Sequence, residues 1–355
     1  MNLEKLLQKN PFKIKKKIKY DFFNNMIKDL TFHHYKFCEE YKKIILNLNI
    51  NIKKIKNISD FPMLPVRLFK YYDLKSVKKK HIVKKLVSSG TSSQNLSRIY
   101  LDKKNAKDQI VVLEKIMSYV IGKNRLPMLI IDQNPKYSAK DNFNARSAAI
   151  YGFSIFGKNH CFLLNKKKEI DYDSLNIFLE KFSSQNFLIF GFTSLVYDYL
   201  INKISNKSII DKFNNGILLH GGGWKKMEQI KIDNKKFKEK LNNKFNIKKV
   251  HNYYGLVEQT GSIFVESEKC GYFHTSIFSD ILIRGKNFDI LENKKKGLIQ
   301  LISLLPTSYP GHNILTEDIG EIIGEDNCKC GLSGKYFLVH GRAKEAELRG
   351  CSDVG

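Results

Sequence analysis

Short apolar runs alternate with stretches of helical periodicity through the middle of the chain. The apolar runs carry hardly any polar residue before their last position, which is typical of strands buried on both faces. They occupy residues 128–132, 187–192 and 216–220. Helices are predicted between them, over 145–152 and over 193–200, where Thr193 or Ser194 can serve as the cap. Strands that alternate with helices in this way predict an α/β domain with a mainly parallel sheet.

The segments on either side of this region have other patterns. Residues 1–60 are basic and carry apolar stripes at helical spacing, and prolines interrupt the pattern just beyond them. A strand is predicted over 82–87 and a helix over 101–121. After about residue 262 the apolar runs become shorter, as in 281–283 and 298–301, and they predict a smaller β-rich portion.

The net charge is strongly positive, +26 from 61 basic and 35 acidic residues. Lysine is interleaved with isoleucine and asparagine along the whole chain, whereas arginine, the residue that base readout favours, is scarce. We therefore interpret the charge as a compositional bias, and keep a nucleic-acid-binding protein only as an alternative class. A basic surface also favours acidic partners and anionic substrates.

The sequence also bears on location. No apolar run reaches the roughly 18 residues of a membrane-spanning helix, and the start, Met1-Asn2-Leu3-Glu4-Lys5, lacks the pattern of a secretory signal. These features predict a cytoplasmic protein with no membrane span. In that compartment the six cysteines are not expected to form a disulfide framework.

A loop rich in hydroxyl groups follows the predicted strand 82–87. It reads Ser88-Ser89-Gly90-Thr91-Ser92-Ser93-Gln94. Backbone N–H groups and hydroxyls in such a loop can surround a phosphate. The Gly-Lys-Ser/Thr ending of a P-loop is missing, and an ordinary polar turn has the same composition.

Further polar motifs come after this loop in a definite order. They are Gly221-Gly222-Gly223-Trp224, Tyr253-Tyr254-Gly255-Leu256-Val257-Glu258, Asp318 before a turn glycine, and Gly341-Arg342. An aromatic residue followed by glycine and then a carboxylate can stack on a base and hold a metal. A turn with a surface acid is the alternative for that motif alone.

Taken in this order, the motifs resemble those of the adenylate-forming synthetases. The greatest similarity is to the acyl-protein synthetase family of the fatty-acid reductase system of bacterial bioluminescence, followed by the phenylacetate–CoA ligases. The resemblance covers nearly the whole chain. It runs from Phe61-Pro62-Met63-Leu64-Pro65 through Gly221-Gly222-Gly223-Trp224-Lys225 to Arg349-Gly350-Cys351.

The resemblance implies an α/β fold, that of the N-terminal domain of an adenylate-forming synthetase, with parallel sheet layers and a small β-rich portion. The C-terminal small domain of such enzymes, which carries a lysine that touches the reacting carboxylate, is expected to be largely absent, because the chain stops at Gly355. The implied parts are a helical segment (1–60), an ATP- and acyl-binding core (61–262), a β-rich subdomain with a candidate zinc site (263–340), and a hinge with a cysteine tail (341–355).

The resemblance also implies a role for each motif. Ser88, Ser89, Gly90, Thr91 and Ser92 would hold the phosphates of ATP, and Gly222, Gly223, Tyr253 and Tyr254 would line the adenine pocket. Glu258 would bind Mg²⁺, which suits a hard oxygen ligand beside phosphates. Asp318 would take the ribose hydroxyls, and Arg342 would lie at the hinge near the nucleotide.

The chain departs from the superfamily pattern in a few places. Ser93 stands where the phosphate loop usually has a glycine, and Arg98 is the nearest cation where a lysine is usual. Val257 replaces the threonine that commonly precedes the metal-binding glutamate. None of these changes removes a group that the basic scheme needs.

Cys351 is a candidate nucleophile. In acyl-protein synthetases a cysteine near the carboxyl terminus accepts the activated acyl group as a thioester, and Cys351 matches it in position. Arg342, Lys344 and Arg349 are near in sequence, and cations lower the pKa of a thiol. From composition alone, a cysteine without a role in a frayed terminus is the alternative.

Cys270, His274, Cys328 and Cys330 offer three thiolates and one imidazole. That is a complete tetrahedral set for structural zinc, although the Cys-x-Cys spacing is tighter than in common zinc knuckles. Related phenylacetate–CoA ligase-like proteins also place cysteine and histidine here. The alternative is a set of reduced, unliganded cysteines with His274 in a pocket.

The resemblance implies an acid–thiol ligase that uses ATP and Mg²⁺ to convert a fatty acid to an acyl adenylate, releases pyrophosphate, and moves the acyl group to Cys351. A reductase and an acyl-transferase are the implied protein partners. Phe190, Gly191, Phe192 and the segment Tyr151-Gly152-Phe153 are candidates for the acyl pocket. Coenzyme A, a carrier protein or a sugar amine are alternative acceptors.

Overall fold

The computed structural model describes residues 2–88, 96–137, 145–224 and 232–343. These residues form two compact units. The first contains the described residues up to Ser88, those from 96 to Val120, and those from Gly255 onward. The second contains the described residues of Ile121–Tyr254. The fourfold functional division expected from the sequence stays a prediction.

The second unit is built on a parallel sheet. Its strands, in the order in which they lie side by side, are β8 (Lys249–Tyr254), β7 (Gly216–Gly221), β6 (Phe187–Phe192), β4 (Leu126–Gln133) and β5 (Gly157–Leu164). The predicted parallel sheet is therefore confirmed. The strands read as continuous apolar runs because helices and loops cover both faces of the sheet, so neither face needs polar side chains.

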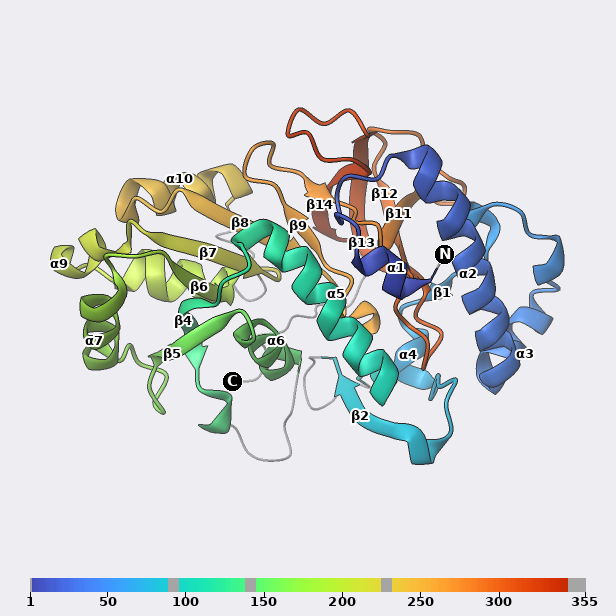
Figure 1. The fold of residues 1–355 in the computed structure, drawn as a ribbon, viewed down its shortest axis with the longest axis horizontal. Coiled ribbons are helices and arrows are strands. Elements are labelled where there is room, and N and C mark those ends of the chain that lie inside the picture. Colours follow the sequence, from blue (N-terminus) through green and yellow to red (C-terminus); the bar gives the residue numbers. More distant parts are fainter. Residues whose placement is uncertain (1, 89–95, 138–144, 225–231, 344–355) are drawn as a thin grey trace. The chain divides into compact units, whose positions relative to one another are not determined.

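Helices on the two faces of this sheet bury different rings. On one face Phe187, Leu218 and Val250 pack with residues of the helical segments. Those segments are α7 (Tyr172–Phe182), η5 (Val196–Lys203), α9 (Lys207–Ile210), η6 (Asp211–Phe213) and α10 (Asn234–Phe245) (Figure 1). On the other face Phe153 of α6 (Ala145–Ser154) stacks on Phe190, with ring centroids 4.8 Å apart.

The predicted helix over 193–200 is present as a short α-helix, α8 (Thr193–Leu195), that continues into the π-helix η5. The proposed cap is wrong. Phe192 is the N-cap, and it makes no side-chain hydrogen bond there. The Thr193 hydroxyl instead lies 3.0 Å from Nδ1 of His220 and 3.2 Å from the carbonyl oxygen of Gly221, and so joins α8 to the carboxyl end of β7.

The first unit contains an antiparallel sheet. Its neighbouring strands are β11 (Ser279–Arg284), β12 (Gly297–Ser303), β13 (Asn313–Glu325), β14 (Lys335–Arg342), β10 (Phe273–His274) and β9 (Phe264–Glu266). A short strand, β1 (Leu64–Pro65), pairs in parallel with β13, and β2 (Ile82–Val87) forms a separate ribbon with β3 (Arg98–Asp102). The β-rich portion expected after residue 262 is present.

Helices from the amino-terminal part of the chain pack in the same unit. They are α1 (Leu3–Leu7), α2 (Lys16–Phe37), α3 (Glu39–Asn47), η1 (Ile52–Lys54), η2 (Ile58–Asp60), α4 (Leu68–Tyr71), η3 (Lys79–His81) and α5 (Lys103–Ile121) (Figure 1). A buried ion triad anchors α2: Lys19 Nζ lies 3.6 Å from Asp280, which also lies 3.1 Å from Lys335 Nζ. Among the described helices, none is long and apolar enough to cross a membrane.

Three histidines are buried as neutral rings. Burial lowers the pKa of His220 and of His312 to about 3, and holds the pKa of His34 well below its usual range. His34 donates to or accepts from Ser76 at 2.7 Å, and His312 lies 3.0 Å from the hydroxyl of Thr31. These rings are fixed in hydrogen-bonded positions that a second proton would disturb.

We expect acid to destabilise the protein through these rings. Below about pH 6.5 the unfolded chain binds protons that the folded chain cannot, so the free energy of unfolding falls by about 1.4 kcal/mol per histidine and pH unit. Above that pH the stability from these rings is complete. Thermal unfolding from pH 7.5 to pH 5 measures the effect. His312→Gln should flatten the profile and the exposed His81→Gln should not; a profile that His312→Gln leaves equally steep would contradict the assignment.

Candidate functional site

Glu258 is a buried carboxyl group in the first unit. It sits on η8 (Val257–Gln259) and is 4% exposed. The next residue fixes this turn, because the Gln259 amide donates to the carbonyl oxygens of Leu301 (3.0 Å) and Gly311 (2.8 Å). A Cβ atom at Gly311 would lie 2.6 Å from the Glu258 carbonyl oxygen, so only glycine allows this approach.

Burial raises the pKa of Glu258 above its ordinary value, and Asp318 adds to the effect. The Ser97 hydroxyl and the Arg342 guanidinium act in the opposite direction and favour the ionised form. A carboxyl group with this balance favours a further cation beside it, since a cation would offset the burial. Its chemistry and position therefore fit a ligand of Mg²⁺.

Asp318 and Arg342 lie next to each other on neighbouring strands. The antiparallel register of β13 and β14 pairs these two residues directly, and Arg342 Nε lies 3.9 Å from Oδ1 of Asp318. Glu317, one residue before, lies 3.7 Å from Arg342 Nη1 and also forms an ion pair with Arg67. The structure thus brings together Glu258, Asp318 and Arg342, which the sequence analysis placed in one site.

Sequence reasoning missed Ser97, Glu317 and Arg67. Ser97 ends the hydroxyl-rich segment, and Glu317 directly precedes the predicted ribose ligand. Arg67 comes just after the proline-flanked motif at 61–65. A positive charge directly after a short strand was the feature that could have pointed to it. Each becomes significant only through a partner that is distant in the chain: Glu258 for Ser97, and each other for Glu317 and Arg67.

Ser88 lies at the base of the predicted phosphate loop. Its hydroxyl accepts a hydrogen bond from Ser97 N (2.9 Å), and its own N–H donates to the Ser97 carbonyl (3.0 Å). Arg98, the cation nearest to this loop in the sequence, interacts with other residues: it lies 3.4 Å from Asp73 and donates to the Lys70 carbonyl. Ser89, Gly90, Thr91 and Ser92 lie outside the described residues, so their predicted role is untested.

The residues predicted to line the adenine pocket lie in the second unit, at the carboxyl ends of β7 and β8. Gly221 pairs with Tyr253 in the parallel register, and a Cβ atom at Gly221 would lie 2.5 Å from the Tyr253 ring. Gly222 has a positive φ of 78°, and Gly223 is exposed beside it. Tyr254 is half-buried at the end of β8.

The residues suggested for an acyl pocket pack against one another. Phe153 stacks on Phe190 with ring centroids 4.8 Å apart, and it also packs against Tyr253 in a tilted arrangement at 4.7 Å. A Cβ atom at Gly191 would meet Val196 at 2.8 Å. These rings fill the space between α6 and the sheet, so their assignment as pocket walls stays a prediction.

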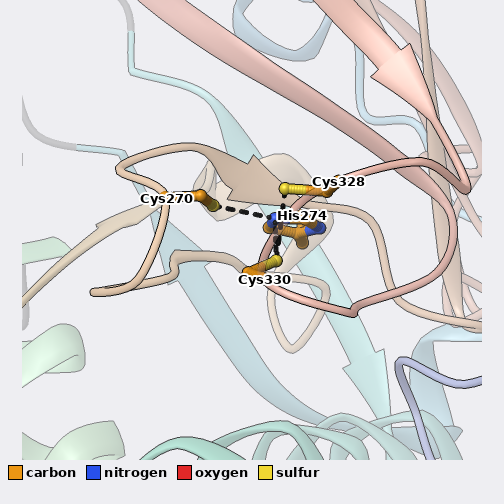
Figure 2. A group of neighbouring side chains, drawn as sticks. All are labelled: Cys270, His274, Cys328 and Cys330. Carbon is orange, nitrogen blue, oxygen red and sulfur yellow. Dashed lines mark hydrogen bonds between the residues drawn. The ribbon is translucent and has the colours of Figure 1, made fainter.

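Cys270, His274, Cys328 and Cys330 come together in the first unit (Figure 2). Their ligand atoms all lie within 4.8 Å of one another. His274 Nε2 is 3.4 Å from the Cys270 sulfur and 3.3 Å from the Cys330 sulfur, and the Cys328 and Cys330 sulfurs are 3.2 Å apart. These separations suit four ligands around one Zn²⁺, with metal–ligand bonds of about 2.0–2.3 Å.

The imidazole of His274 is in the neutral form that binds a metal ion. Burial lowers the pKa of His274 to about 4, so the ring is neutral, and its Nε2 lies toward the sulfurs of Cys270 and Cys330. The ring also stacks on Tyr336, which pairs with His274 across β10 and β14. The cluster joins β10 to the turn between β13 and β14. The five cysteines in the described parts of the chain are free thiols, and Cys351 lies outside those parts.

Comparison with known proteins gives the fold class and the family. The structure of 2-hydroxyisobutyryl-CoA ligase in complex with 2-HIB-AMP and CoA is similar, with a TM-score of 0.70 and 11% identity over 94% of this chain and 77% of that chain. The fold is thus that of the adenylate-forming ligases. Residues 2–355 match the family described as "Acyl-protein synthetase, LuxE". The chain belongs to the acyl-protein synthetase family and is an enzyme of the ligase class.

Two named proteins are similar to this chain in sequence. The long-chain-fatty-acid–luciferin-component ligase of Aliivibrio fischeri is 24% identical over 309 residues, which cover 84% of this chain and 78% of that protein. The protein of the same name from Vibrio harveyi is 21% identical over 343 residues, covering 93% and 86%. The resemblance stated from the motifs is confirmed.

Proposed function

We propose that this enzyme activates a long-chain fatty acid with ATP and Mg²⁺ and then transfers the acyl group to its own Cys351. The observation that supports the proposal best is the buried Glu258 beside Arg342 and Asp318, in a chain of this family. The relatives are named long-chain-fatty-acid–luciferin-component ligases, and the neighbour of similar fold was solved in complex with 2-HIB-AMP and CoA.

The reaction has two displacement steps. A carboxylate oxygen of the fatty acid attacks the α-phosphorus of ATP, the bond to the β-phosphate bridging oxygen breaks, and pyrophosphate leaves with the electron pair. The Cys351 thiolate then attacks the acyl carbonyl carbon, the bond to the AMP oxygen breaks, and AMP leaves.

The chain's own residues would serve the first step by positioning and by charge. Glu258 would hold Mg²⁺, which neutralises phosphate charge when bound. Asp318 would accept hydrogen bonds from the ribose hydroxyls, and Arg342 would lie against the nucleotide. Ser88 to Ser92 would contact the phosphates, and the glycines and tyrosines at the ends of β7 and β8 would flank the adenine.

Two assays test this proposal. Pyrophosphate release from ATP with straight-chain fatty acids should be fast for long chains and absent without acid. Mass spectrometry of the intact protein should then show a mass increase of one acyl group. Absence of pyrophosphate release with every carboxylic acid tested would refute the proposal, and tight, salt-sensitive DNA binding by the same preparation would favour the alternative class.

Removal of the acceptor thiol should separate the two steps. Cys351→Ser is expected to abolish the acyl-protein mass shift and to leave pyrophosphate release in the first turnover intact, because in the proposed reaction the thiol acts only after pyrophosphate has left. Cys161→Ser is the matched control, since burial raises the pKa of that thiol to about 12 and makes it a poor nucleophile. Full acyl-protein formation by Cys351→Ser would contradict self-acylation. It would then favour coenzyme A, a carrier protein or a sugar amine as the acceptor.

We further propose that the Cys/His cluster holds a structural Zn²⁺ and that a reductase and an acyl-transferase exchange acyl groups with the enzyme. The zinc proposal rests on the four converging ligands of Figure 2. With all four ligands supplied by protein, the ion would have no open position for catalysis.

A further inference from the structure

Strand β13 of the first unit pairs along one edge first with β1 and then with β14, and charged residues gather where these two strands meet it. In the parallel pairing of β1 with β13, Leu64 lies opposite Ile314 and Pro65 opposite Leu315. The Val66 N–H donates to the Leu315 carbonyl at 2.9 Å, which continues the pairing beyond β1. Extension of this register by two residues puts Arg67 beside Glu317.

Further along the same edge of β13, opposite the edge that pairs with β12, the register with β14 brings Arg342 to Asp318. The Ala343 N–H donates to the Glu317 carbonyl at 2.9 Å and holds the end of β14 against β13. Through the pairing of β1 with β13, the motif at 61–65 places Arg67 beside the nucleotide-binding residues expected on β13 and β14.

Glu317 is the centre of this row. Its side chain is 12% exposed and forms an ion pair through Oε1 with Nε of Arg67. Its other oxygen, Oε2, is buried and accepts no hydrogen bond from the described residues. The cation that faces Oε2 is Arg342, at 3.7 Å, and the same guanidinium lies 3.9 Å from Asp318. Arg342 is thus shared between two carboxylates.

We propose that Arg67 and Glu317 are positioning residues that hold Arg342 beside Asp318 for the nucleotide. The positive charge of Arg67 offsets part of the negative charge of Glu317. Glu317 can therefore orient Arg342 without drawing it away from Asp318. Without Arg67, the full charge of Glu317 draws Arg342 away from Asp318. Without the charge on Glu317, Arg342 loses the group that orients it. This inference rests on the proposed adenylation and assigns these two residues a part in binding ATP.

The test is steady-state pyrophosphate release with ATP varied at saturating fatty acid. Arg67→Ala is expected to raise KM for ATP about tenfold, a loss of about 1.4 kcal/mol, with kcat changed less than twofold. Arg67→Lys should recover part of the affinity, because lysine restores the charge without the planar guanidinium. Lys104→Ala, which removes an exposed ion pair with Asp108 in the same unit, is the matched control and should leave both constants unchanged.

Coupling between the two residues distinguishes positioning from general damage. Glu317→Gln should raise KM for ATP to a similar extent, and the double variant Arg67→Ala/Glu317→Gln should be no worse than the poorer single variant. If Arg67→Ala lowers the unfolding temperature, its KM also reflects damage to the fold. The test of the positioning role then rests on Glu317→Gln, which is nearly isosteric. Unchanged KM in Glu317→Gln, or additive effects in the double variant, would overturn the inference.

The proposed function can fail separately. A wild-type enzyme that releases no pyrophosphate refutes adenylation, and the positioning role with it. A wild-type enzyme that is active, with Arg67 and Glu317 variants of unchanged KM for ATP, refutes the positioning role alone.

Discussion

Replacement of Glu258 by glutamine is expected to lower kcat for pyrophosphate release by about a hundredfold or more, without loss of stability. The glutamine amide has the same shape as the carboxyl group and remains within the turn that Gln259 anchors. It carries no charge, however, and cannot hold Mg²⁺ as a carboxylate does. The variant therefore removes the proposed metal ligand and little else.

The stability of this variant has a pH dependence with a definite sign. The pKa of Glu258 is raised in the folded protein, chiefly by burial, so ionisation of this group disfavours the folded state. The loss is absent at pH below the ordinary pKa of a glutamate and develops as the pH rises through that value. Glu258→Gln avoids this loss, so its unfolding temperature should equal that of the wild type in acid and match or exceed it near pH 7.

Calorimetry at pH 4.5 and pH 7.5, together with pyrophosphate release at several Mg²⁺ concentrations, measures both effects. Glu180→Gln is a suitable control, because Glu180 is exposed and pairs only with Lys212 on the surface of the other unit among the described contacts. Wild-type activity in Glu258→Gln would remove Glu258 from the catalytic site. A lower unfolding temperature at pH 7.5 would mean that the carboxylate supports the fold instead.

Whether a feature could be predicted from the sequence depends on how far apart in the chain the interacting residues lie. The strands β4, β6 and β7 were predictable because each is apolar on both faces, a property of the local sequence. The N-cap at Phe192 was not, since the Thr193 hydroxyl takes a partner on β7 that lies 27 residues further along the chain. A local capping rule cannot anticipate that competitor.

The candidate site shows the same dependence. Glu258, Asp318 and Arg342 could be placed in the candidate site because their motifs have a recognisable order. Arg67 was not found, because its importance depends on β1 pairing with a strand that is about 250 residues away in the chain. The candidate acyl-pocket residues stay a prediction, because aromatic residues suited to a lipid chain are equally suited to packing against one another, as Phe153 and Phe190 do.

The Cys/His cluster lies between these cases, since its members were predictable from residue type but their convergence depends on the fold. Cys270 comes from the segment between β9 and β10, His274 from β10, and Cys328 and Cys330 from the turn after β13. The antiparallel pairing of β10 with β14 brings the two pairs together. A bound Zn²⁺ would cross-link segments that are separated by more than fifty residues.

Loss of this metal is expected to be among the most destabilising changes in the protein. A ligand that binds only the folded state stabilises it by about 4 kcal/mol when its free concentration is a thousand times Kd. The purified enzyme should contain about one zinc per chain. Cys330→Ser or His274→Ala should remove the zinc and lower the unfolding temperature, and a strong chelator should do the same to the wild type.

Cys38→Ser is the matched control for these substitutions. Cys38 is also a buried thiol of the first unit, but it packs in a separate apolar cluster with Tyr41 and Ile45. It should keep its zinc, whatever its effect on packing. Wild-type protein that contains no zinc and is insensitive to zinc and chelator would show that the four side chains are a reduced, metal-free cluster. Zinc loss with unchanged pyrophosphate release at low temperature is expected, because the ion would stabilise β10 and the β13–β14 turn and take no part in the chemistry.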